Sequence, residues 1–255
     1  MIMKAELYTN CSLVRLPIKA GVTDYAFPQN VEWAGRKVER IALCVPSVAC
    51  IDPVDGQTPV MTTSDMANCY LSLYDNDNRE IMYDVSWEQL AHFNNSPLYI
   101  DAALNLSLCK LYFTSAPAAD ATLLMYVFYG TRTEDYFDVP RKSVTAVFPL
   151  QANEQITLQE VINTYVHALP GKICGMLFWD AESNPAYVTL RDYDLTYQMA
   201  NIHTTMARPD KNAGTAEDSQ AHLFLINDLD IDFDYSNIRN ATNSANTQKV
   251  TFLYS

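Results

Sequence analysis

The sequence predicts an all-β protein made of two tandem antiparallel β-sandwich domains, residues 1–132 and 133–255, with a few short helices. Three observations lead to this prediction. The 16 Tyr and 10 Phe residues favour strands, because aromatic side chains fit a pleated, half-buried surface. Short apolar runs are separated by turn-forming residues. Segments of the first half also reappear in the second half in the same order.

The internal repeat is carried by three pairs of segments. The first pair sets Pro17 against Pro140, the second sets Tyr70 against Tyr187 without a gap, and the third sets Leu104 against Leu229. Three matches in one order are harder to obtain by chance than any single match. In full, the pairs are residues 16–28 with 139–149, 70–77 with 187–194, and 97–130 with 222–255.

Two kinds of apolar pattern predict the strands. Residues 104–108 and 229–235 alternate apolar and polar, as expected for strands with one face in a core. Residues 41–45, 123–128 and 176–179 are continuously apolar, as expected for strands buried on both faces. Helices are too few for β-α-β units, so a parallel sheet is not expected.

Capping boxes predict two short helices. One begins at Ser86, with Gln89 three residues later. The other begins at Thr157, with Glu160 three residues later, and its apolar residues keep helical spacing until Pro170 stops it.

Three connecting segments complete the predicted layout. Residues 131–140 are a short polar linker between the halves. Residues 46–66 and 203–221 are long and rich in polar and small residues, which is typical of surface loops.

Charge and cysteine content limit the function classes. The net charge of −13, with no basic arm, disfavours direct binding to a phosphate backbone. The cysteines are scattered, several among apolar neighbours, which favours buried free thiols and folding in a reducing cytosol. They are Cys11, Cys44, Cys50, Cys69, Cys109 and Cys174.

No catalytic, cofactor-binding or metal-binding residue is predicted. The sequence has no Gly-x-Ser-x-Gly elbow, no glycine-rich phosphate loop and no zinc-binding doublet. Cys174 lies in an apolar strand run, where a thiol is usually inert. The histidines are expected at the surface or at helix ends; they are His92, His167, His203 and His222.

One acidic cluster leaves three interpretations open. If residues 228–234 form one strand, four aspartates point to the same side of it. They could form a solvated face, pair with lysines or arginines of a neighbouring subunit, or bind calcium through oxygen ligands. The four are Asp228, Asp230, Asp232 and Asp234.

Two tandem antiparallel domains with around eight short strands each form the pattern of a double jelly roll. In layout, length and paired segments, residues 16–255 resemble the small double jelly-roll major capsid proteins of tailless icosahedral viruses, particularly bacteriophages. The resemblance implies upright jelly rolls, trimeric capsomers and a shell often laid over a membrane. Three chains closed into a ring would present six similar domains, a pseudo-hexagonal block that tiles a facet.

The expected function is therefore a non-enzymatic one, that of a major capsid protein self-assembling as homotrimers into an icosahedral shell. Its place would be the virion, and the host cytoplasm during assembly. The expected partners are further copies in the trimer and in neighbouring capsomers, other virion proteins, and an internal membrane reached through minor proteins, with no direct nucleic acid contact.

Three alternatives remain. A carbohydrate- or receptor-binding jelly-roll module would use exposed aromatic side chains as stacking platforms. A phage neck, ring or tail protein would assemble in another symmetry. A cupin-like enzyme is disfavoured, because the histidines lie too far apart in sequence for its metal motif.

Overall fold

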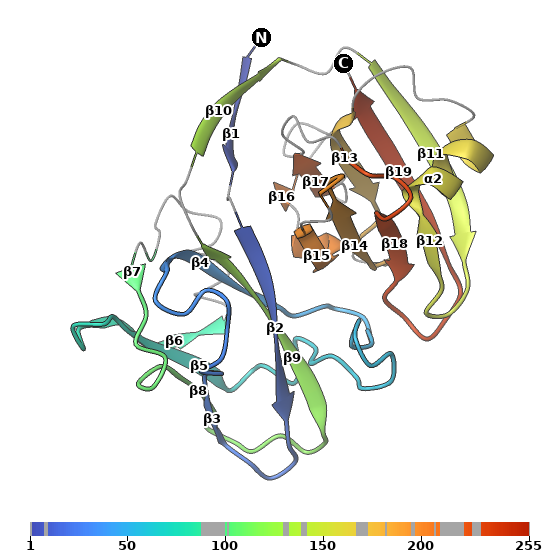
Figure 1. Ribbon diagram of the computed structural model, residues 1–255. Helices are drawn as coiled ribbons and strands as arrows, with labels where there is room; N and C mark the ends of the chain where they lie inside the picture. The colour runs from blue at the N-terminus through green and yellow to red at the C-terminus, as the bar shows by residue number, and fades with distance from the viewer. Residues whose placement is uncertain are drawn as a thin grey trace. The chain divides into compact units, whose positions relative to one another are not determined.

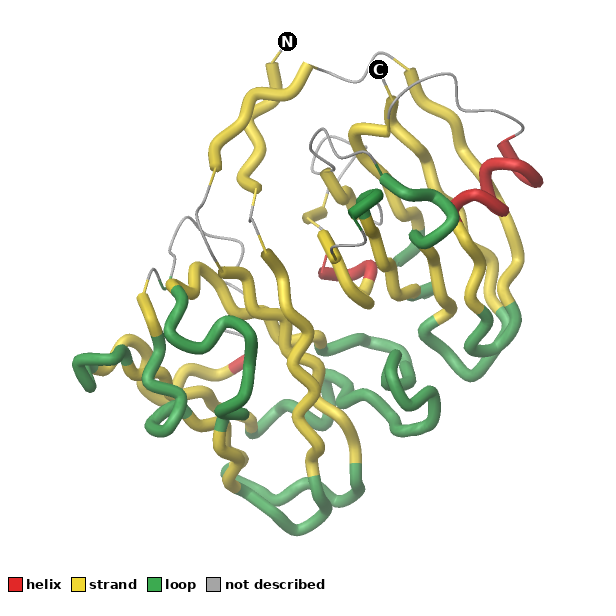
Figure 2. Tube along the Cα trace, viewed as in Figure 1, coloured by secondary structure: helices red, strands yellow, loops and turns green. Residues whose placement is uncertain are grey.

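The computed structural model describes residues 2–7, 10–87, 100, 102–129, 133–138, 142–166, 173–181, 183–194, 197–206, 208–209, 222–225 and 231–254. Strands predominate in it, and helix is confined to short segments (Figure 2). The chain forms two compact units. Unit 1 consists of Met1–Leu7, Val48–Gly56 and Thr133–Ser255, and unit 2 of Tyr8–Ser47 and Gln57–Arg132.

Unit 2 is a sandwich of two four-stranded antiparallel sheets (Figure 1). Its strands are β2 (Asn10–Ile18), β3 (Asp24–Ala26), β4 (Lys37–Cys44), β5 (Cys69–Tyr74), β6 (Glu80–Ser86), β7 (Ala102–Ala103), β8 (Lys110–Phe113) and β9 (Ala121–Tyr129). One sheet has the order β2-β9-β4-β7 and the other the order β3-β8-β5-β6.

The core of unit 2 lies between these two sheets. Leu71 and Leu73 of β5 and Leu111 of β8 point into it, and Trp33 packs there with 1% of its surface exposed. Period-2 alternation accordingly puts the intervening residues of β5 and β8 on the outer face. Almost every residue of β9 is buried, which confirms the strand predicted at 123–128.

Unit 1 holds the second sandwich. Its strands are β11 (Lys142–Leu150), β12 (Gln155–Thr157), β13 (Ile173–Trp179), β14 (Ala186–Arg191), β15 (Tyr197–His203), β16 (Arg208–Pro209), β17 (His222–Leu225), β18 (Asn237–Asn240) and β19 (Asn246–Tyr254). They form the sheets β11-β19-β13-β17-β16 and β12-β18-β14-β15. A separate antiparallel pair joins β1 (Ile2–Leu7) to β10 (Thr133–Asp138).

The two sandwiches have the same strand order. With the strands of each half counted from one to eight, and β16 set aside as an added edge strand, one sheet reads 1-8-3-6 and the other 2-7-4-5 in both halves. Two such antiparallel sheets facing each other form a jelly roll. The predicted fold class, two tandem jelly rolls with few short helices, is confirmed.

The duplication extends to backbone irregularities. The hairpins β5-β6 and β14-β15 have the same register and the same two register shifts. At the shift, Asp84 (φ 51°) of one hairpin corresponds to Asn201 (φ 48°) of the other. The backbone N–H of each donates to a hydroxyl on the neighbouring strand, Ser72 for Asp84 and Thr189 for Asn201. The second pair of repeat segments is therefore confirmed.

The first pair of repeat segments is wrong in register. Strand β2 corresponds to β11, so Pro17, next to the last residue of β2, corresponds to Pro149 rather than Pro140. In the third pair, Tyr129 and Tyr254 end equivalent strands as predicted. Leu104, however, corresponds to Ile231, since these two residues bridge to Asp75 and Asp192 respectively.

The strand predicted at 104–108 is also wrong, and so is the described part, 231–235, of the strand predicted at 229–235, in the same way. Residues 106–108 and 233–235 are turns. The Asn105 side chain accepts a hydrogen bond from the N–H of Ser107, and the Asp232 side chain accepts one from Asp234. Such Asx turns compete with the extended backbone that alternation suggests.

The second predicted helix is present. It begins with α2 (Leu158–Val161) and continues as a π-helical segment, Ile162–Val166. The Thr157 side chain accepts a hydrogen bond of 3.1 Å from the N–H of Glu160, as a capping box requires. The first predicted helix, from Ser86 to Gln89, and the stop at Pro170 extend outside the described residues. None of the described helices is long and apolar enough to span a membrane.

Candidate functional site

In the described part of the predicted aspartate row, Asp232 and Asp234 do not lie on a strand. Asp232 lies at a turn and uses its carboxylate to accept from the N–H groups of Asp234 and Tyr235. Asp228 and Asp230 lie outside the described residues. Within the part of the chain that is described, no group of three or more His, Cys, Asp or Glu residues could hold a metal ion.

The histidines are only partly placed. His203 is fully buried, at 0% exposure, so its predicted position at the surface is wrong. It does lie at a helix end, because it directly precedes the 3-10 helix Thr204–Met206. For His222 only the backbone, in β17, is described. His92 and His167 lie outside the described residues.

Five cysteines are free thiols, and four of them are buried. Burial raises the pKa of Cys69 to about 12, and it does the same for Cys11 despite the opposing charge of Arg40. A thiol that keeps its proton is a poor nucleophile. The prediction of free thiols is confirmed for Cys11, Cys44, Cys50, Cys69 and Cys109; the side chain of Cys174 is not described.

Within the surface loop predicted at 46–66, residues 50–53 are buried, whereas Val54 is 58% exposed, so the prediction is only partly correct. This part of the chain belongs to the segment Val48–Gly56, which lies in sequence between β4 and β5, yet is part of unit 1. Cys50 and Ile51 are each 3% exposed, and Asp52 is 0% exposed. We call Val48–Gly56 the covering segment, because it lies across the outer face of the sheet β12-β18-β14-β15.

The covering segment crosses three neighbouring strands of that sheet. The Cys50 Sγ lies 3.4 Å from Nε2 of His203 on β15. The Tyr187 hydroxyl on β14 donates a hydrogen bond of 2.8 Å to the carbonyl oxygen of Ile51. The Arg239 guanidinium on β18 donates to the carbonyl oxygen of Pro53. Arg239, Tyr187 and His203 stand opposite one another in the strand register and so form one row.

The end of the covering segment requires a glycine. Gly56 has φ +67°, and a Cβ there would lie 3.0 Å from Nη2 of Arg239. The Asn153 amide donates a 2.9 Å hydrogen bond to the Gly56 carbonyl and accepts one of 2.8 Å from Nη2 of Arg239. Side chains of unit 1 therefore fix the segment at its end as well as along its length.

The Cys50–His203 pair has the separation of a nucleophile and a base, but both side chains are packed. The His203 ring contacts the Tyr187 ring at 5.3 Å between centroids, and its Nδ1 lies 2.7 Å from the Thr205 hydroxyl. At 3% and 0% exposure, Cys50 and His203 are closed to a substrate from solution. Their evident role is to hold the covering segment in place.

On the equivalent face of unit 2 the corresponding row is half-buried or exposed rather than buried. We call the residues of that row the tyrosine row; they are Asp24, Tyr112, Tyr70 and Ser86, opposite one another on β3, β8, β5 and β6. Tyr70 and Tyr112 are half-buried, and their rings stack at 5.6 Å between centroids with an interplanar angle of 22°. Partial burial and a hydrogen bond to Asp84 raise the pKa of Tyr112 to about 12.

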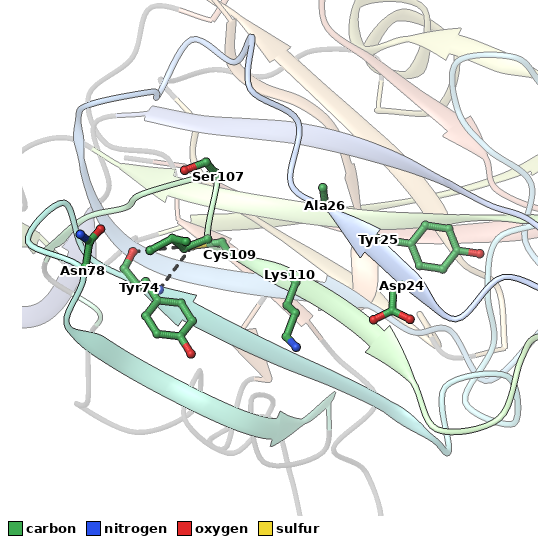
Figure 3. A pocket seen from close by; sticks show the side chains of 9 residues that line it. Asp24, Tyr25, Ala26, Tyr74, Asn78, Ser107, Cys109 and Lys110 are labelled. Atoms are coloured by element: carbon green, nitrogen blue, oxygen red, sulfur yellow. Dashed lines mark hydrogen bonds between the residues drawn. The ribbon is translucent and has the colours of Figure 1, made fainter.

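A shallow hollow of about 680 Å³ adjoins the tyrosine row on the same side of the sheet. Figure 3 shows Lys110 between Tyr74 and Asp24 along this hollow. Cys109 also lines the hollow, and its Sγ accepts a hydrogen bond of 3.4 Å from the N–H of Tyr74. Leu108 lines the hollow and is 43% exposed. The hollow combines apolar and charged side chains with no convergent catalytic group.

A second open row lies on unit 1. The lysine row consists of Val147, Lys249 and Trp179, which stand opposite one another on β11, β19 and β13. Val147 is 54% exposed, and Nζ of Lys249 lies 5.1 Å from the centre of the Trp179 ring system. The equivalent row of unit 2 is Arg15, Leu124 and Cys44, in which Leu124 and Cys44 are 0% exposed.

These surfaces were missed at the sequence level. The run of apolar residues at 48–51 was the available signal that residues 46–66 contain a buried segment. The alternation of Tyr70, Ser72 and Tyr74 was the signal for an aromatic outer face.

Comparisons with known proteins find fold-level likeness at most. No protein-family model matches the chain. No curated protein matches it either. Two solved structures are similar over almost all of the chain. The major capsid protein P2 of bacteriophage PM2 has 12% identity and a TM-score of 0.28, with 99% of this chain and 97% of that chain covered. A chain from the atomic structure of Sulfolobus turreted icosahedral virus has 11% identity and a TM-score of 0.24, with 99% and 90% covered. These TM-scores are too low to establish a shared fold, so the evidence for the fold class is the chain's own strand order.

Proposed function

We propose that this chain is a structural virion protein, the major capsid protein of an icosahedral shell, and that it self-assembles as pseudo-hexagonal trimers. The observation that carries the proposal is the duplication: two jelly rolls in one chain share strand order, register and the same irregular hairpin. We place the boundary between the two jelly-roll domains at residue 133, with Met1–Leu7 and Val48–Gly56 as parts of the first domain's sequence that join unit 1.

The duplication has a geometric use in a shell. Two similar sandwiches per chain give six per trimer. A trimer is then pseudo-hexagonal and can tile a flat facet. Such a ring closes through heterologous contacts, in which unlike faces of neighbouring copies meet. Faces that stay open in one chain are then covered in the assembly.

The chemistry of the described residues suits this role better than catalysis. The Cys50–His203 pair and the Asp232 carboxylate are engaged in internal contacts. The acidity of the chain disfavours direct contact with nucleic acid, so we assign genome and membrane contacts to other virion proteins. The place of the protein would be the virion, after assembly in the host cytoplasm.

Light scattering after size-exclusion chromatography tests the proposal. A mass three times the 28.8 kDa of the chain is expected, and electron microscopy should show six-lobed particles. A strict monomer at every accessible concentration would contradict it.

The aromatic outer face of unit 2 favours one second candidate, a carbohydrate- or receptor-binding module. The stacked Tyr70 and Tyr112 rings are the kind of platform on which a sugar can pack. Binding on a glycan array by a monomeric protein would support this candidate over the capsid.

A further inference from the structure

We propose that the tyrosine row of unit 2 is the docking surface for the lysine row of a second copy of this chain. The inference rests on the proposed self-assembly and names the surfaces that meet. It follows from comparing each row with its equivalent in the other sandwich.

The equivalent of the tyrosine row is already covered within one chain. Tyr187 corresponds to Tyr70 and His203 to Ser86, because the two hairpins share one register. Tyr187 is 1% exposed and His203 is 0% exposed beneath the covering segment. In unit 1, this row on the outer face of the sandwich is therefore covered by a segment of the same chain.

The tyrosine row has the same strand register as the row of Tyr187 and His203, but it is accessible to solvent. Asp24 is exposed, Tyr70 and Tyr112 are half-buried, and the hollow beside them is open. The connection in the second half that corresponds to the covering segment, between β13 and β14, is short. Its Asn184 already donates to Asp180 and accepts from Gln248. That connection has no free length to act as a second covering segment.

The lysine row shows the complementary asymmetry. In unit 2 the equivalent row is mostly buried, with Leu124 and Cys44 at 0% exposure and Arg15 half-buried, whereas Lys249, the residue equivalent to Leu124, is exposed. Each chain thus has two kinds of row, and of each kind one copy is mostly buried and the other is accessible. A head-to-tail contact that joins the two open faces would give both sandwiches similar surroundings.

Side-chain chemistry favours this pairing. The tyrosine row and its surroundings present two stacked tyrosines with the carboxylates of Asp24 and Asp84. The Lys110 ammonium lies 5.1 Å from the centroid of the Tyr112 ring, so these three charged groups together carry one net negative charge. The lysine row presents an ammonium group with an indole and an apolar side chain beside it. Tyrosine and tryptophan are enriched at the centres of protein interfaces, and opposite charges fix their register.

Two substitutions test the proposal in the full chain. Tyr70→Arg and Lys249→Glu should each raise the dissociation constant of the oligomer about tenfold or more, as expected for central interface residues, while the melting temperature stays that of the parent. Tyr193→Arg, at a tyrosine that is 67% exposed outside both rows, is the matched control and should associate like the parent. If Tyr70→Arg fails to fold, Ser86→Arg, opposite Tyr70 in the same row, replaces it.

Cross-linking gives a second measurement. A carbodiimide applied to an equal mixture of ¹⁵N-labelled and unlabelled protein should join Lys249 of one copy to Asp24 or Asp84 of another. Mixed-isotope peptides carrying this link support the proposal, and their absence from an oligomeric sample overturns it.

The outcomes separate this inference from the proposed function. A parent protein that is always monomeric refutes the self-assembly itself. A parent that forms oligomers, together with folded Tyr70→Arg and Lys249→Glu variants that do so equally well, leaves self-assembly standing and overturns the assignment of these rows. Glycan binding that is lost in Tyr70→Arg while the oligomer persists also overturns it, in favour of a carbohydrate ligand.

Discussion

The hydroxyl group of Tyr187 donates a 2.8 Å hydrogen bond to the carbonyl oxygen of Ile51, which lies 136 residues earlier in the chain. The same position in the other sandwich is held by Tyr70, whose ring instead stacks on Tyr112 at a half-buried surface. The tyrosine at this position is therefore part of a buried contact in unit 1 and part of the accessible surface in unit 2.

Replacing Tyr187 by phenylalanine should lower the free energy of unfolding by about 1–3 kcal/mol, because it leaves the buried Ile51 carbonyl without its donor. Urea unfolding followed by circular dichroism measures the loss. Tyr70→Phe is the matched control at the equivalent position, and we expect a change within about 0.5 kcal/mol, as for most surface substitutions. Equal losses in the two variants would show that the Tyr187 hydrogen bond has no special weight.

Gly56→Ala should destabilise the protein more than Gly35→Ala. Both glycines have positive φ, so alanine costs about 1–2 kcal/mol at either position. Only at Gly56 would the new Cβ also press on the Arg239 side chain, at 3.0 Å; at Gly35 nothing lies within 4 Å. Thermal melts of the two variants provide the comparison, and a larger loss for Gly35→Ala would contradict the packing described for the covering segment.

Asp84→Asn should change the free energy of unfolding by less than about 0.5 kcal/mol, because asparagine already occupies the equivalent position, 201, with the same left-handed backbone. Asp84→Ala should cost about 1–2 kcal/mol, since alanine is unfavourable at positive φ and cannot accept from Ser72. Denaturant titration measures both variants. An alanine variant as stable as the asparagine variant would argue against equivalence of the two hairpins.

Stability should fall at alkaline pH. The pKa values of Cys11 and Cys69 are raised from 9.0 to about 12, and that of Tyr112 from 10.0 to about 12, in each case mainly by burial. The folded protein then keeps protons that the unfolded chain releases, so this contribution is intact below pH 9 and is lost progressively as the pH rises from 9 to 12.

Urea midpoints at pH 8, 9.5 and 11 test this dependence. Tyr112→Phe should reduce the slope above pH 10, while Tyr193→Phe, which removes an exposed phenol, should leave it unchanged. A parent protein with a flat profile up to pH 11 would contradict the expectation.

The sequence was sufficient for the fold class but not for every strand. Buried strands such as β9 are continuously apolar, and the β5 and β14 segments matched without a gap, so local pattern identified them. Alternation misled at 104–108 and 229–235, because the Asn105 and Asp232 side chains bond to the backbone two residues on and turn the chain. Pattern alone does not separate such a turn from a strand.

The candidate surfaces were beyond the reach of the sequence for a different reason. Pairing of Cys50 with His203 joins positions 153 residues apart, and no local periodicity encodes such a contact. The exposure of the tyrosine row likewise depends on which of two equivalent faces receives a covering segment. Only tertiary structure distinguishes Tyr70 from Tyr187.

Unit 1 is assembled from three separate stretches of chain, and this sets an order on its synthesis. Met1–Leu7 and Val48–Gly56 are translated long before Thr133–Ser255, with which they pack. Every stretch of unit 2 has been translated by Arg132, so its folding can finish on the growing polypeptide. The hydrogen bond between Ile51 and Tyr187 cannot form until Tyr187 has emerged, and β19, which lies between β11 and β13, is translated after the other strands of that sheet.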